Sequence, residues 1–183
     1  MERLLDAVKS ISDVAASIVV YCAEYIHLHT LDALDITEEV FEHPVQANFK
    51  GTFLLSQAAA RAMLEGGITD GVIVNVSCRV AYGATPGVPR RVYGACKATV
   101  VSLTRSMAAE LAPLVFRCKA VLPGLTDSPA VDGMPEDVLN KLCAWIPLGR
   151  IAQPREVAEV VFLCSPQSSY AVGSESFVSG GRQ

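Results

Sequence analysis

Short apolar runs alternate along the chain with longer segments in which apolar residues recur at helical spacing. Four runs predict strands: SIVVYCA (17–23), GVIVNVS (71–77), FRCKAVL (116–122) and ESFVS (175–179). The first two runs are continuous and rich in β-branched residues, which is typical of strands buried on both faces of a sheet. Pro123 and Gly124 end the third run, and Gly180 and Gly181 follow the fourth.

Helical spacing predicts helices over four further segments: 2–10, about 37–65, 92–112 and about 154–163. Gly66 and Gly67 end the second of these helices, and Pro154 suits the first turn of the last. Strands and helices alternate, with connections long enough for parallel pairing. We therefore expect an α/β fold, in which helices cover a parallel sheet.

Composition narrows the class of protein. The 183 residues, 51% of them hydrophobic and 19% charged, suit a single globular domain. A net charge of −4 argues against a nucleic-acid partner, which requires basic clusters. No apolar run approaches the roughly 20 residues of a membrane span, so neither an anchor nor a secretory signal is expected.

The cysteines indicate an intracellular compartment. All six stand singly, without CxxC spacing and mostly within apolar runs, as reduced and buried thiols do. The three histidines are not spaced to complete a metal-ligand set with them. We expect neither disulfides nor a metal site.

Tyr93 and Lys97 stand four residues apart at the start of the third predicted helix and so share one face of it. An ammonium beside a phenol lowers the tyrosine pKa from about 10, which suits proton transfer near neutral pH. A pair at this spacing also occurs by chance in many helices. The carboxyl ends of the strands, where parallel sheets bind ligands, supply further candidates: Ala23, Ser77, Cys78, Pro123 and Gly124.

Taken together, these segments resemble the short-chain dehydrogenase/reductase family over nearly the whole chain. The family's YxxxK motif matches Tyr93-Gly-Ala-Cys-Lys97, its active-site asparagine matches Asn48 in VQANFKGTFLLSQAA, and its serine-bearing strand resembles GVIVNVSC. The turn under the nicotinamide, the substrate-side region and the last strand are similar to VLPGLTDSP, IPLGRIAQPREVAEVVFLCS and SYAVGSESFVSGG. Each pattern alone is weak, but their shared order is specific.

The resemblance implies hydride transfer between NAD, or NADP, and a carbonyl or secondary alcohol of the 3-oxoacyl thioester or 17β-hydroxysteroid type. It implies that Tyr93 passes the proton to the carbonyl oxygen, that Lys97 holds the nicotinamide ribose and lowers the Tyr93 pKa, and that Asn48 positions a water. Cys78 aligns with the catalytic serine. The implied cofactor contacts are Ala23, Tyr93, Lys97, Pro123, Gly124, Thr126, Asp127 and Ser128. Asn48 as an ordinary helix residue and Ser128 as a loop cap remain alternatives.

The chain also departs from the family pattern near the site. A TGxxxGxG phosphate loop has no counterpart, so we expect one incomplete Rossmann-type domain over 1–183 that binds NAD poorly and, by itself, reduces no carbonyl at a useful rate. Glu24 replaces a glycine beside the cofactor, where a carboxylate is unfavourable, and Lys119 replaces the asparagine before the Pro-Gly turn. Ser77 is one residue early and should face away from Cys78, because side chains alternate along a strand.

Two functions therefore remain open, an oxidoreductase or a catalytically silent isoform or interaction subunit of a reductase complex. The resemblance implies a homo-oligomer or a hetero-oligomer with a related subunit, and the mitochondrial matrix or the cytoplasm as its location. Apolar residues on the two long helices exceed what one sheet face covers: Phe49, Phe53, Leu54 and Ala58 on one, Val100, Leu103, Met107 and Leu111 on the other.

Overall fold

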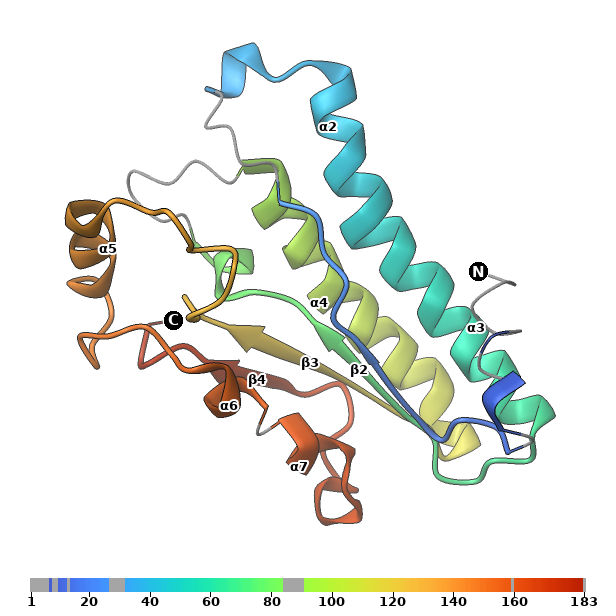
Figure 1. Cartoon of the computed structure of the whole chain (residues 1–183). Coiled ribbons are helices and arrows are strands. Elements are labelled where there is room, and N and C mark those ends of the chain that lie inside the picture. The colour runs from blue at the N-terminus through green and yellow to red at the C-terminus, as the bar shows by residue number, and fades with distance from the viewer. Residues whose placement is uncertain are drawn as a thin grey trace.

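Four parallel strands lie side by side at the centre of the molecule (Figure 1). They are β1 (Ile18–Tyr21), β2 (Val72–Val76), β3 (Arg117–Pro123) and β4 (Glu175–Val178), hydrogen-bonded in that order. In the register, Val72 of β2 pairs with Ile18 on one side and with Arg117 on the other. The predicted α/β class and parallel sheet are confirmed.

This computed structural model describes residues 7, 10–12, 14–26, 32–83, 91–158 and 160–182. The predicted helix 2–10 lies largely outside the described residues. Within the described part of the chain, no helix combines the length and apolar character needed to cross a membrane.

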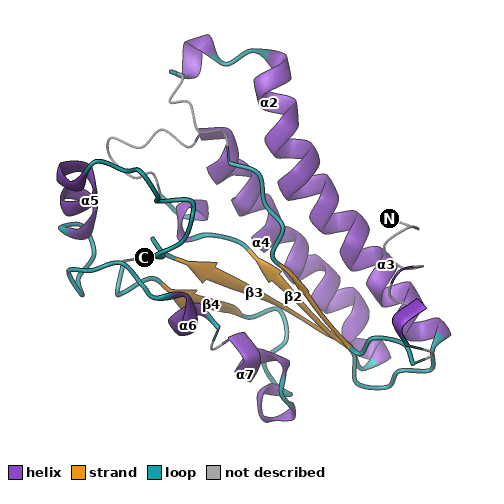
Figure 2. Cartoon of the chain, in the orientation of Figure 1, coloured by secondary structure: helices purple, strands orange, loops and turns teal. Residues whose placement is uncertain are grey.

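The long helices pack together on one face of the sheet (Figures 1 and 2). Residues 38–65 form one rod, built from α2 (Glu38–Pro44), the π-helical η2 (Val45–Lys50) and α3 (Gly51–Glu65). The Thr37 hydroxyl caps its start by accepting a hydrogen bond from the Val40 amide at 3.3 Å. Beside the rod runs α4 (Arg91–Leu111), so both long helices predicted from periodicity are confirmed.

The other face carries shorter helices. The predicted helix 154–163 is divided into α6 (Pro154–Val157) and α7 (Val160–Cys164), and a further helix, α5 (Glu136–Cys143), lies beyond the carboxyl edge of the sheet. Single 3-10 turns complete the described elements: η1 (Ala33–Asp35), η3 (Arg79–Ala81), η4 (Ala112–Leu114) and η5 (Pro166–Ser168).

Side-chain alternation along the strands divides the core between the two faces. Towards α3 and α4, Ile73 of β2 packs in a cluster that includes Met63 and Phe116. Val72 and Val74 point to the opposite face, where they pack against Leu163 of α7. The polar Asn75 also faces the long helices, and it joins them by hydrogen bonds at 3.2 Å to Ser56 and 3.1 Å to Thr104.

Two expectations about burial are wrong. Ile18 and Val20 of β1 are 48% and 37% exposed, because β1 is the border strand of the described sheet and pairs only with β2. On α4, Val100 and Met107 are 1% and 9% exposed, so they belong to the core rather than to a free helix face. The partly buried Leu103 and Leu111 pack against the same core.

Candidate functional site

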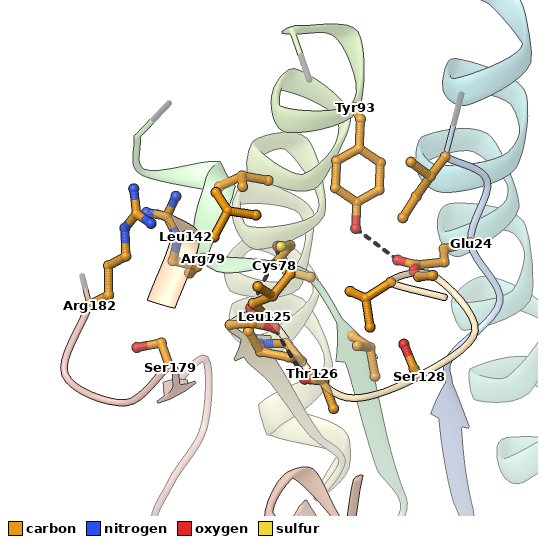
Figure 3. Close-up of a pocket in the computed structure, with 18 of the residues that line it drawn as sticks. Glu24, Cys78, Arg79, Tyr93, Leu125, Thr126, Ser128, Leu142, Ser179 and Arg182 are labelled. Atoms are coloured by element: carbon orange, nitrogen blue, oxygen red, sulfur yellow. Dashed lines mark hydrogen bonds between the residues drawn. The ribbon is translucent and has the colours of Figure 1, made fainter. Parts of the chain in front are cut away.

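A pocket of about 200 Å³ opens at the carboxyl edge of the sheet (Figure 3). It lies where parallel α/β sheets bind their ligands. Its walls come from the residues that follow β1, β2, β3 and β4, together with Tyr93 at the start of α4 and apolar residues around α5. The lining residues used below are Glu24, Cys78, Arg79, Tyr93, Leu125, Thr126, Ser128, Met134, Leu142, Ile146, Ser179 and Arg182.

Close packing of α4 brings Tyr93 to this pocket. Gly94 lies so near the turn after β2 that an added Cβ would be 3.3 Å from the Val80 carbonyl oxygen. From the other side, the Ser77 hydroxyl donates to the Lys97 carbonyl at 2.7 Å, and Lys97 Nζ donates to the Val76 carbonyl at 2.9 Å. These contacts fix the first turns of α4 against the end of β2.

One carboxylate oxygen holds both residues of the Tyr93 and Lys97 pair. Glu24 Oε2 accepts a hydrogen bond from the Tyr93 hydroxyl at 2.8 Å and lies 3.2 Å from Lys97 Nζ. The Lys97 side chain is 3% exposed, and its Nζ is 5.5 Å from the centre of the Tyr93 ring. The ammonium therefore serves the Glu24 carboxylate and the Val76 carbonyl rather than the phenol oxygen.

The expected lowering of the Tyr93 pKa is wrong for this structure. Burial raises the pKa of Tyr93 most strongly, and the charges of Cys78 and Glu24, with their hydrogen bonds, raise it further. The Lys97 ammonium pairs with the Glu24 carboxylate, so it does not offset these increases in the Tyr93 pKa. Tyr93 is therefore a protonated phenol at neutral pH.

Asn48 lies behind this cluster, on η2. Its side chain pairs with the backbone of Tyr25, accepting from the amide at 3.0 Å and donating to the carbonyl at 2.8 Å. Asn48 is 1% exposed and is not among the described residues that line the pocket. It thus anchors the segment next to Glu24, and its expected part in a water relay stays a prediction.

The two residues after β2 have different partners. Ser77 is buried and bonded to the Lys97 backbone, whereas the partly exposed Cys78 directs its thiol to the Pro123 carbonyl, 3.6 Å away. The thiol also acts on Tyr93, since it contributes to the raised pKa of the phenol. Both residues line the pocket, and Cys78 at the position of the family's serine stays a prediction.

The expected cofactor residues are divided between the pocket and its surroundings. Pro123, Gly124, Thr126 and Ser128 line the pocket. Asp127 is tied elsewhere, since its amide donates to the Ala152 carbonyl at 2.8 Å and its carboxylate accepts from the Gln153 side chain at 3.3 Å. Among the described residues, Ala23 is exposed and does not line the pocket.

Sequence reasoning missed two arginines. Arg79 follows Cys78 directly, and Arg182 follows the Gly180-Gly181 pair after β4, and both line the pocket. Both arginines could have been predicted from the sequence, because each follows a strand whose carboxyl end faces the site. Among the described residues, no group of three or more metal-ligating side chains gathers that could hold a metal ion.

The model of the enoyl-(acyl carrier protein) reductase family matches residues 1–183. The chain belongs to the short-chain dehydrogenase/reductase family. A (3R)-3-hydroxyacyl-CoA dehydrogenase of Mus musculus is 39% identical over 180 residues, which cover 98% of this chain and 68% of that relative. Estradiol 17-beta-dehydrogenase 8 of Callithrix jacchus is 40% identical over 131 residues, covering 71% of this chain and 96% of that one.

A solved short-chain dehydrogenase/reductase supports the fold as well. The crystal structure of a 3-oxoacyl-[acyl-carrier protein] reductase with bound NAD from Brucella melitensis matches with a TM-score of 0.88 and 28% identity, covering 98% of this chain and 66% of that one. These findings confirm the predicted family. The chain spans about two thirds of the length of the Mus musculus relative.

The family implies a nicotinamide dinucleotide, and the donors at the pocket fit one end of it. The hydroxyl-bearing residues Tyr93, Thr126 and Ser128 line the pocket, whereas Lys97 is not among the described lining residues and contacts Glu24 beside it. The hydroxyls and the ammonium are groups that hydrogen-bond a ribose and a carboxamide. Glu24 is the exception, because its carboxylate engages Tyr93 and Lys97 and repels phosphate charge. The residues therefore fit the nicotinamide and ribose end once Glu24 has released these two partners.

Proposed function

We propose that the protein is an NAD(P)-dependent oxidoreductase that interconverts a carbonyl and a secondary alcohol. The observation that carries the proposal is the convergence of the Tyr93 hydroxyl, the Lys97 ammonium and the Cys78 thiol at the carboxyl edge of the sheet. Membership of the short-chain dehydrogenase/reductase family, whose relatives include named dehydrogenases and reductases, supports it.

Tyr93 supplies the proton in this proposal. Its raised pKa keeps the phenol protonated at neutral pH, so its hydroxyl can donate to a carbonyl oxygen during reduction. The Cys78 thiol, beside it, is a second but weaker donor to the same oxygen. A bound nicotinamide would supply the hydride to the carbonyl carbon, or accept it in the reverse direction.

The remaining parts of the site hold the cofactor in this proposal. Lys97 binds the nicotinamide ribose, and the turn after β3 contacts the carboxamide end through Thr126 and Ser128. NAD is the proposed cofactor, with NADP as the alternative. The names of the relatives support 3-oxoacyl thioesters or 17β-hydroxysteroids as substrate types. A homo-oligomer or mixed oligomer, and the mitochondrial matrix with the cytoplasm as the alternative, are further parts of the proposal.

A second candidate function, a catalytically silent interaction subunit, is favoured by Glu24. One of its carboxylate oxygens accepts the hydrogen bond of the Tyr93 hydroxyl and pairs with the Lys97 ammonium. These are the two groups that must serve substrate and cofactor in the oxidoreductase. For the oxidoreductase to work, Glu24 must move away from both. The two candidates therefore predict opposite outcomes in an activity measurement.

The test is reduction of acetoacetyl-CoA, followed by the loss of NADH or NADPH absorbance. If the oxidoreductase proposal holds, wild type should turn over, though slowly because it is expected to bind NAD poorly by itself, and Tyr93→Phe should reduce kcat at least a hundredfold, as removal of an acid catalyst typically does. Tyr170→Phe is the matched control, because Tyr170 is fully exposed. Turnover that survives Tyr93→Phe would refute the proposed role of Tyr93, and a folded wild type that is inactive with both cofactors would favour the silent subunit.

A further inference from the structure

The end of β1 is attached to the helical rod at two points. The Tyr21 hydroxyl donates to the Ala47 carbonyl at 3.1 Å. Further along the chain, the backbone amide and carbonyl of Tyr25 pair with the Asn48 side chain at 3.0 and 2.8 Å. Because Ala47 and Asn48 are neighbours in η2, one short stretch of the rod holds both ends of the segment 21–25, which we call the strap.

The rod departs from a regular helix where the strap is attached. Val45–Lys50 form a π-helical turn, in which the backbone hydrogen bonds span five residues rather than four. Such turns mostly interrupt longer α-helices and frequently lie at functional sites. The rod is α-helical on both sides, in α2 and α3, so the irregularity is confined to the turn that holds the strap.

Gly51 gives the Tyr21 hydroxyl room to reach this turn. A Cβ added at Gly51 would lie 2.7 Å from the hydroxyl oxygen, closer than nonbonded atoms pack, but 3.7 Å from Cζ of the same ring, which is an ordinary contact. The backbone of Gly51 is helical, so an alanine would suit the helix better. Its methyl group, however, would push the hydroxyl away from the Ala47 carbonyl.

The strap carries Glu24, the residue that engages Tyr93 and Lys97. Its carboxylate accepts from the Tyr93 hydroxyl at 2.8 Å (Figure 3) and lies 3.2 Å from Lys97 Nζ. Glu24 immediately precedes Tyr25, whose backbone the Asn48 side chain holds. Since the backbone is attached to the rod on both sides of Glu24, the carboxylate is presented to the same two partners.

We propose that Tyr21 is a positioning residue for Glu24 and acts through the strap. Its hydroxyl holds the strap against η2, and the strap presents the Glu24 carboxylate to Tyr93 and Lys97. Loss of this hydroxyl lets the strap lift and carries Glu24 away from the site. The inference concerns how Glu24 is held, and only its consequence for turnover rests on the proposed function.

Two measurements without any nicotinamide test the proposal. Native-state hydrogen exchange of the Tyr25 amide, followed by NMR, reports how often the strap lifts. Acetylation of Lys97 by acetic anhydride, followed by mass spectrometry, reports how often Glu24 uncovers the amine. Tyr21→Phe should speed both about fivefold, since it removes one hydrogen bond. Lys141, which is 75% exposed, should be acetylated at the same rate in every variant.

Ser56→Ala is the matched control. It removes a hydrogen bond of the same rod, the 3.2 Å contact with Asn75, without touching the strap. It should therefore leave the Tyr25 exchange and the Lys97 acetylation at their wild-type rates. A merely structural role of Tyr21 would instead make Tyr21→Phe and Ser56→Ala behave alike.

Gly51→Ala reaches the strap by a second route. Its methyl group should displace the Tyr21 hydroxyl, so the Tyr25 exchange and the Lys97 acetylation should rise although alanine favours the helix. In the double variant with Tyr21→Phe, the methyl group meets no hydroxyl. Exchange there should be no faster than in Tyr21→Phe alone.

Wild-type exchange of the Tyr25 amide in Tyr21→Phe, or faster exchange without faster acetylation of Lys97, would overturn the proposal. An equal increase in Ser56→Ala would overturn it too, because the effect would then reflect overall stability. Additive increases in the double variant would do the same, since Gly51 would then not act through the hydroxyl. An inactive chain that shows the expected responses would refute the proposed function and leave this inference standing.

Discussion

The Tyr93 hydroxyl donates to Glu24 Oε2 at 2.8 Å, and Lys97 Nζ lies 3.2 Å from the same oxygen. A single side chain thus ties down the two residues to which we assign proton transfer and cofactor binding. The Glu24 side chain is 36% exposed, whereas that of Lys97 is 3% exposed, so the carboxylate is the partner with room to leave. In the proposed oxidoreductase, release of Glu24 is therefore the step that would make the site available.

Replacing Glu24 by Gln should release the Lys97 ammonium and raise NADH affinity about tenfold, or about 1.4 kcal/mol. It should also lower the Tyr93 pKa, which burial alone will still hold above its usual value of about 10. Fluorescence titration measures the first effect, and the tyrosinate absorbance of Glu24→Gln against wild type measures the second. Glu110→Gln, an exposed change on the same helix as Tyr93, is the control, and an unchanged affinity in Glu24→Gln would contradict the prediction.

Replacing Cys78 by Ser should increase carbonyl reduction. A hydroxyl donates a stronger hydrogen bond than a thiol, and one donor to a developing oxyanion is typically worth on the order of 10²–10³ in rate. We expect an increase in kcat of up to about a hundredfold, with little change in the KM for NADH. Cys78→Ala should give no increase, and Cys164→Ser, outside the pocket lining, should leave kcat unchanged. A decrease in Cys78→Ser would show that the thiol does not face the reacting oxygen.

The buried Lys119 should make stability rise with pH. Its Nζ donates to the carbonyls of Leu163 and Ser168 at 2.7 and 2.8 Å, and burial lowers its pKa from 10.5 to about 8. Between pH 8 and 10.5 the unfolded chain holds a proton that the folded chain has lost, so this group increases the free energy of unfolding as pH rises. Below pH 8 both states are protonated and the penalty for the buried charge is complete.

Urea unfolding at several pH values between 7.5 and 10 measures this effect, with reducing agent present for the thiols. The difference in unfolding free energy between wild type and Lys119→Met should grow in favour of wild type across this range. Lys141→Met serves as the control, because that side chain is 75% exposed and pairs with Asp137 on the surface. Equal pH slopes for wild type and Lys119→Met would contradict the assignment.

The exposed apolar face of the helical rod should mediate self-association. Phe49, Phe53 and Leu54 are 38%, 39% and 36% exposed, and they remain available after the corresponding residues of α4 have been assigned to the core. We expect wild type to sediment as a dimer or larger species at micromolar concentration and Phe53→Glu to shift it toward monomer. Val161→Glu, on the opposite face of the sheet, should not. A monomeric wild type would refute the prediction.

Most of the sheet and its long helices could be predicted, because β-branched runs and the residues that interrupt them are local signals. The helix α5 was missed, since its eight residues offer too few turns for a clear period, although Glu136 and Asp137 at its start and Lys141 near its end suit a helix dipole. The exposure of β1 could not be read from SIVVYCA, because burial of a strand depends on which neighbours cover it.

The site was predicted as far as spacing and strand ends allowed. Helical spacing placed Tyr93 and Lys97 together, and strand alternation separated Ser77 from Cys78. The contact of Glu24 with Tyr93 could not be predicted, since it joins residues 69 positions apart through the folded sheet. The predicted sign of the Tyr93 pKa shift was wrong for the same reason. That sign depends on how deeply the phenol is buried and on which group the Lys97 ammonium contacts, and both are set by the folded structure.

The open border of β1 has a consequence for how the protein behaves in concentrated solution. Ile18 and Val20 are exposed on this strand, which within the described sheet pairs only with β2. Such an edge can recruit a strand from another molecule, and without a charge or a proline in IVVY there is little to discourage irregular stacking. Precipitation at high concentration would then begin at this strand. Val20→Lys should delay it and leave the pocket unchanged, because Val20 is not among the described lining residues.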